Sequence, residues 1–134
     1  MTELATVVRV NGQSPELWRA DPTHVYVGRQ LFLRSGKYAR ETWPNSSWGN
    51  PIKLPAHPTI EDRRQVIRDY ENYLARRSLL LRQLHTLAGK KLGCWCGNWD
   101  GLSEPRLLCH AAVLADWVNR MQRGEKPWEF SGQR

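Results

Sequence analysis

The side chains best suited to chemistry are three cysteines and one histidine, namely Cys94, Cys96, Cys109 and His110. Cys94 and Cys96 close an apolar run, and Cys109 stands where a helical pattern begins. The free backbone N–H groups of a helix start stabilise a thiolate and lower its pKa. Cys109 is therefore a candidate catalytic nucleophile, with His110 as the imidazole that assists it. The alternative is that Cys109 is a small buried hydrophobic residue.

The same four side chains are also potential metal ligands. Zinc takes four sulfur or nitrogen ligands in a tetrahedron, and alternate residues of a strand point to one face. The Cys-x-Cys spacing is shorter than that of common zinc knuckles, and adjacent ligands are strained. We predict no resident cofactor and keep zinc as an alternative, with the ligands Cys94, Cys96, Cys109 and His110.

Two upstream motifs carry further candidate ligand-binding residues. Gly28 allows close approach to a ligand, and the Arg29 guanidinium suits a phosphate or carboxylate. Asn50 precedes Pro51, which favours an extended backbone, and its amide can bond a ligand. Each motif also fits an ordinary turn with a solvated arginine or a pinned loop.

The seven tryptophans are unusual for 134 residues. Indoles in loops can stack on bases, or they can wedge a loop onto the core. We assign Trp48 and Trp95 as a candidate stacking face and keep core packing as the alternative.

Short apolar runs ended by turn residues predict strands, over residues 6–10, 24–27 and 90–96, with a further short strand over 31–33. Helical spacing predicts three helices, from Thr59, over 79–88, and from Leu108 or Cys109 to Gly124. Thr59 and Asp62 resemble a capping box. We expect a small two-layer or three-layer α/β domain whose short, mostly parallel sheet is flanked by about three helices. In such folds ligands bind beyond the carboxyl ends of the strands.

One domain is predicted over residues 1–124, with a long loop rich in tryptophan and proline over 30–58 and a polar, mobile tail over 125–134. The net charge of +7 favours a nucleotide, a nucleic acid or another phosphorylated ligand as partner. No apolar run approaches the roughly 20 residues that span a bilayer, so no membrane partner is expected. The clustered, odd cysteines and the absence of a signal-peptide pattern favour a cytoplasmic protein.

The motifs Val-Gly-Arg, Trp-Gly-Asn-Pro, Gly-Cys-Trp-Cys and Cys-His occur in this order over roughly Val7 to Trp117. The ordered set resembles a family of small bacterial and phage proteins catalogued as domain of unknown function 4326. The resemblance supplies no reaction, so whether the protein is an enzyme stays open. It implies that one set of residues forms one site or framework, namely Gly28, Arg29, Trp48, Asn50, Cys96, Cys109 and His110.

The leading hypothesis is a cytosolic α/β domain that binds a nucleotide or nucleic acid at the strand ends. If it is an enzyme, it processes that ligand with a thiolate or an imidazole. The first alternative is a zinc-stabilised, non-catalytic nucleic-acid-binding module. The second is a phage-encoded interaction domain that acts on a host protein through tryptophan anchors in the 30–58 loop.

Overall fold

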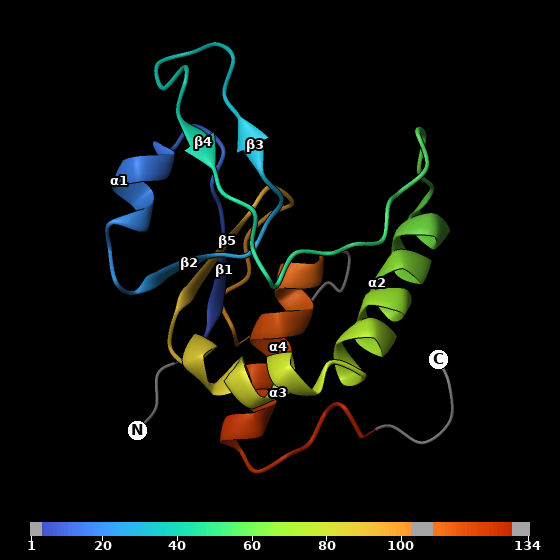
Figure 1. The fold of residues 1–134 in the computed structure, drawn as a ribbon. Coiled ribbons are helices and arrows are strands. Elements are labelled where there is room, and N and C mark those ends of the chain that lie inside the picture. The colour runs from blue at the N-terminus through green and yellow to red at the C-terminus, as the bar shows by residue number, and fades with distance from the viewer. Residues whose placement is uncertain (1–3, 103–108, 130–134) are drawn as a thin grey trace.

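The computed structural model describes residues 4–102 and 109–129. Its elements in chain order are β1 (Thr6–Arg9), α1 (Pro15–Arg19), β2 (His24–Tyr26), β3 (Leu31–Phe32), β4 (Thr42–Trp43), α2 (Ile60–Ala75), α3 (Ser78–Gln83), the 3-10 helix η1 (Leu84–Leu87), β5 (Lys91–Cys94) and α4 (His110–Gln122) (Figure 1). This mixture confirms the predicted α/β class. None of the helices in the described part of the chain is long and apolar enough to cross a membrane.

The central sheet is parallel and has the strand order β1-β5-β2. Leu92 of β5 lies opposite Val7 of β1 and Val25 of β2. A separate antiparallel pair joins β3 to β4 inside the 30–58 segment. The three parallel strands end at one edge of the sheet, so residues that follow β2 and β5 are brought close together.

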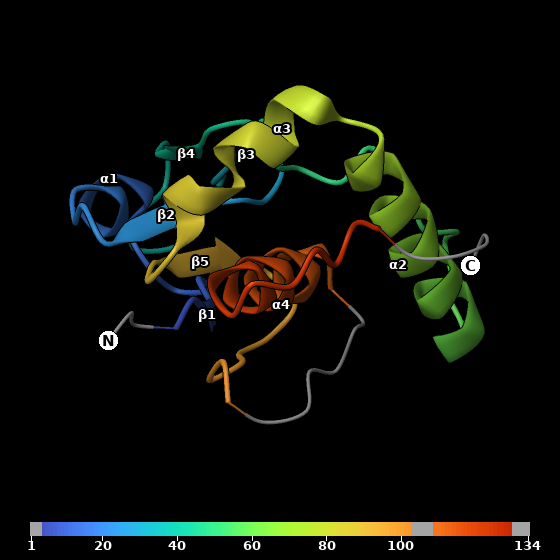
Figure 2. The same ribbon diagram turned by 90° about the horizontal axis from the view of Figure 1, so that it is seen from below.

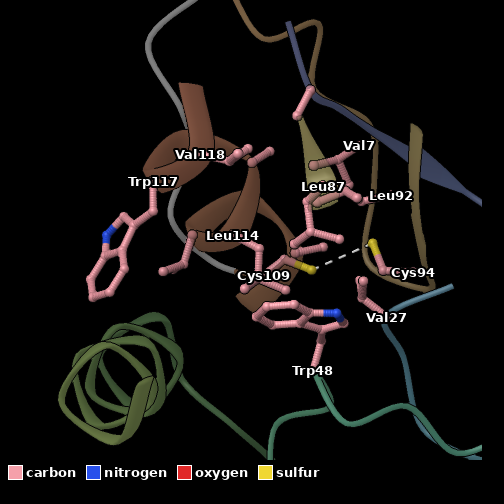
Figure 3. Packing of buried hydrophobic residues seen from close by; sticks show 14 of the residues in the cluster. Val7, Val27, Trp48, Leu87, Leu92, Cys94, Cys109, Leu114, Trp117 and Val118 are labelled. Carbon is pink, nitrogen blue, oxygen red and sulfur yellow. Dashed lines mark hydrogen bonds between the residues drawn. The ribbon is translucent and has the colours of Figure 1, made fainter. Parts of the chain in front are cut away.

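Both faces of the sheet are covered. Helix α4 packs against β1, β5 and η1, and it lies between the sheet and α2 (Figures 1 and 2). The opposite face carries a smaller cluster around Trp18 of α1 and the fully buried Trp43. Gly93 is needed there, because a Cβ atom on it would lie 2.5 Å from the Trp18 ring. Alternation along β5 therefore directs Leu92 and Cys94 into the main core (Figure 3).

Local signals placed the two long helices correctly. The Thr59 hydroxyl accepts a hydrogen bond from the Asp62 N–H at 3.0 Å, and the Asp62 carboxylate accepts one from the Thr59 N–H at 2.9 Å. This is the predicted capping box at the start of α2. Cys109 is the N-cap of α4, as expected for a helix that begins near it, while Leu108 lies outside the described residues.

Several boundaries differ from the sequence prediction. Helix α3 ends at Gln83 and the chain continues as η1, so the expected single helix over 79–88 is two short pieces. Strand β5 ends at Cys94, so Cys96 follows the strand and its side chain is exposed. The predicted tail is described only to Glu129, and within it Trp128 packs against the core.

Candidate functional site

The three cysteines converge from two elements. Cys94 ends β5, Cys96 lies in the bend that follows, and Cys109 caps α4. Their sulfur atoms all lie within 4.8 Å of one another, and the Cys94 and Cys109 sulfurs are 3.5 Å apart (Figure 3). All three are free thiols, and only Cys96 is exposed. We call this set the thiol cluster; its residue types and separations could hold a metal ion.

Hydrogen bonding inside the thiol cluster favours one thiolate, and it favours Cys94. The Cys109 and Cys96 thiols both hydrogen-bond to Cys94, which holds the pKa of Cys94 well below its usual range. The pKa of Cys109 is raised by its hydrogen bond to Cys94, by its hydrogen bond with Cys96 and by burial. Within the described residues the Cys109 thiol makes no capping bond to α4. The sequence predicts the nucleophile at Cys109, and these hydrogen bonds favour the thiolate form at its neighbour Cys94, at the end of β5.

His110 is held away from the sulfurs. Its Nε2 atom lies 2.6 Å from the Val27 carbonyl oxygen, and because a carbonyl only accepts, Nε2 carries the proton. Burial lowers the pKa of His110 and so favours the neutral ring, which packs edge-on to Tyr70. The bond joins the first turn of α4 to the end of β2, so in this structure His110 positions the two elements and does not complete the thiol cluster.

A pocket of about 480 Å³ opens beyond the strand ends. Its wall contains every sequence-predicted site residue except Trp48, namely Gly28, Arg29, Asn50, Cys94, Trp95, Cys96, Cys109 and His110. Segments far apart in the chain thus meet at one place, as the topology of a parallel sheet requires. A larger and shallower hollow of about 550 Å³ lies along the end of α2 by Tyr73 and Arg76, and none of the predicted residues line it.

Two cations of the pocket were not predicted from the sequence. Lys53, from the loop before α2, and Arg63, from the first turns of α2, line the pocket with Arg29. None of the described lining residues carries a carboxylate. The position of Arg63 could have been predicted, because it is four residues before the buried Ile67 and so lies one turn earlier on the same helix face. Lys53 offered no such signal, because its loop has no regular period.

Arg29 and Asn50 each use one side-chain atom in a hydrogen bond to the backbone of Ile52. The Arg29 Nη2 atom donates to the Ile52 carbonyl at 3.3 Å, and the Asn50 Oδ1 atom accepts from the Ile52 N–H at 2.9 Å. The Arg29 bond holds the loop before α2 against the end of β2, and the Asn50 bond fixes a turn within that loop. The amide nitrogen of Asn50 makes no hydrogen bond within residues 4–102 and 109–129, so it is available to a ligand.

Trp48 belongs to the core and does not line the pocket. The residue is 7% exposed, and Figure 3 shows its indole packed beside Cys109. The Tyr70 hydroxyl donates to the Trp48 carbonyl at 2.7 Å, which fixes the loop to α2. The core-packing alternative therefore describes Trp48. Trp43 is also fully buried, so neither tryptophan offers an exposed anchor to a host protein.

Gly28 is required by packing, because a Cβ atom there would lie 2.5 Å from the Tyr26 hydroxyl. That hydroxyl accepts a hydrogen bond from the Trp95 indole at 2.9 Å. We expect Gly28→Ala to lower the free energy of unfolding by about 1–3 kcal/mol, since the buried Tyr26 ring must shift. Urea unfolding measures the loss. Gly97→Ala is the matched control, because no atom lies within 4 Å of the added methyl, and equal stability of the two variants would contradict this account.

Comparison with known proteins identifies one family. The model described as "Domain of unknown function (DUF4326)" matches residues 10–120 of the 134-residue chain. The match confirms the resemblance noted from the ordered motifs, and it spans the whole candidate site from Gly28 to His110. No curated protein and no solved structure matches the chain.

Proposed function

Because the chain belongs to the DUF4326 family, whose description names no activity, we propose a function from the pocket itself: it binds a nucleotide, or a nucleic-acid end, through phosphate. The observation that carries the proposal is the lining of Arg29, Lys53 and Arg63 without a carboxylate among the described lining residues. Three cations facing one cavity attract an anion, and guanidinium groups bind phosphate bidentately. The volume of about 480 Å³ suits a small ligand better than a long strand.

The remaining lining residues supply the other contacts of a nucleotide. Trp95 offers a ring face for a base, and its hydrogen bond to Tyr26 fixes the indole. Asn50 offers its amide N–H groups to a polar edge, and Gly28 and Cys96 complete the wall. The contacts support binding more than catalysis, because Cys109 is buried and His110 is held by Val27. The three free thiols also support a cytoplasmic location.

Titration calorimetry with AMP, UMP, inorganic phosphate and a short single-stranded oligonucleotide tests the proposal across a salt series. We expect the mononucleotides to bind more tightly than inorganic phosphate, because Trp95 adds a stacking contact. Affinity should fall as salt rises, as for any charge-driven site. Failure of all four probes to bind at low salt would refute the proposed function.

A second candidate function is a zinc-stabilised module, favoured by the separations in the thiol cluster. Zinc–sulfur bonds of about 2.3 Å in a tetrahedron place the sulfurs about 3.8 Å apart. The cluster, with one pair at 3.5 Å and all pairs within 4.8 Å, fits this requirement after small shifts.

Elemental analysis of the purified protein decides the zinc candidate. We expect close to one equivalent of zinc and a lower midpoint of thermal unfolding after chelation, because metal binding contributes to folding. A metal content below about a tenth of an equivalent, with an unfolding midpoint that chelator does not move, would eliminate this candidate.

A further inference from the structure

The thiol cluster forms part of the wall of the pocket beyond the strand ends. Cys94, Cys96 and Cys109 all line the pocket that contains Arg29 and Arg63. A metal ion bound by the three sulfurs would therefore contact a ligand in this pocket. The thiols and the cations thus face the same space.

The described residues offer three potential metal ligands. The cluster of potential ligand atoms comprises the three cysteine sulfurs alone within the described chain. His110, the fourth ligand considered from the sequence, has its Nε2 atom bonded to the Val27 carbonyl at 2.6 Å. Sites with three protein ligands and a fourth open position are the arrangement that zinc adopts where it meets substrate.

The charges around the cluster favour an anion at that fourth position. Three thiolates and one divalent cation sum to a single negative charge, which alone would repel phosphate. Arg29, Lys53 and Arg63 line the same pocket and sum to three positive charges. The cations therefore stabilise the thiolates and still leave a net positive charge for an anionic ligand.

We propose that Cys94, Cys96 and Cys109 bind a zinc ion whose fourth coordination position opens into the pocket, where a phosphate oxygen of the bound nucleotide occupies it. The inference rests on the proposed nucleotide binding and gives it a metal contact. Phosphate oxygen is a suitable ligand, because zinc binds oxygen donors at about 2.0–2.2 Å. The zinc would then join the ligand directly to the end of β5 and the start of α4.

Cobalt substitution tests this contact, because visible absorption of cobalt reports its ligands. The full chain is loaded with Co²⁺ and titrated with AMP, and calorimetry is run in parallel on the same sample. We expect one equivalent of cobalt with sulfur-to-cobalt charge-transfer bands. Added AMP should shift the d–d bands with a midpoint equal to the calorimetric Kd. In Arg29→Gln the cobalt should stay bound while that midpoint rises at least about tenfold.

Each outcome separates the two proposals. Unchanged bands at saturating AMP, with binding seen by calorimetry, would overturn the open position and leave the proposed function intact. No stoichiometric cobalt would overturn the metal site alone, and no heat of AMP binding would overturn both. Cys96→Ser is the informative ligand variant, because Cys96 is exposed whereas Cys94 and Cys109 lie in the core. It should keep its circular dichroism spectrum and weaken cobalt binding more than about 100-fold; wild-type cobalt affinity would remove Cys96 from the site.

Discussion

Replacing Arg29 and Arg63 together with glutamine should lower the affinity for AMP by about 100-fold or more. Both side chains line the pocket, and neither is part of the buried core. A hydrogen bond to a charged group contributes about 1.5–3 kcal/mol, and each 1.4 kcal/mol is about tenfold in affinity. Glutamine keeps a polar side chain and removes the charge. Calorimetry at one fixed salt concentration measures the change.

The matched control is Arg82→Gln, which removes the same charge from an exposed position on α3 outside the pocket lining. It should change the affinity by less than about twofold, because exposed charges at a distance are screened by salt. Equal losses in the control and the double variant would mean that AMP responds to the net charge of +7 and not to this pocket.

Trp48→Ala should lower the free energy of unfolding by about 3–5 kcal/mol, the usual loss when a buried tryptophan is truncated. That loss is a large part of the total stability of a typical domain, about 5–15 kcal/mol. The indole packs beside Cys109, and the Tyr70 hydroxyl donates a hydrogen bond to the Trp48 carbonyl. The space left by the missing indole would therefore loosen the packing behind the pocket wall. Urea unfolding followed by circular dichroism measures the effect.

Trp95→Ala should show the opposite pattern. Trp95 is half-buried and lines the pocket, so its loss should weaken AMP binding by about tenfold while stability falls less than in Trp48→Ala. A stable Trp48→Ala that loses AMP binding would instead place Trp48 at the ligand. The pair of variants thus distinguishes a framework tryptophan from a binding one.

Local chemistry made much of the fold predictable. The cap at Thr59 and the helix start at Cys109 depend on neighbouring residues, so both could be predicted from the sequence. The boundaries that differed depend on distant contacts. The pairing of β3 with β4 joins residues about ten positions apart, and no short-range pattern in the sequence predicts this pairing. The end of β5 at Cys94 likewise depends on where β1 and β2 stop pairing with it.

The candidate site was predictable in its membership and less so in its roles. Topology brings Arg29, Asn50 and Cys109 to one pocket, as the ordered motifs implied. Roles depend on side-chain partners that spacing does not reveal. His110 faces the Val27 carbonyl, and Cys94 accepts a hydrogen bond from the Cys109 thiol, which lowers the pKa of Cys94. Trp48 and Trp95 look alike in the sequence, and only packing separates them.

The central claim is that a phosphorylated ligand binds where Arg29, Trp95 and Cys96 meet. Titration of ¹⁵N-labelled protein with AMP tests it directly, because the spectrum contains backbone N–H signals and the indole N–H signals of the seven tryptophans. We predict the largest shifts at the Trp95 indole and at the backbone amides of Arg29 and Cys96. Shifts concentrated at the α2 hollow around Tyr73 and Arg76, or no shifts at saturating AMP, would contradict the account.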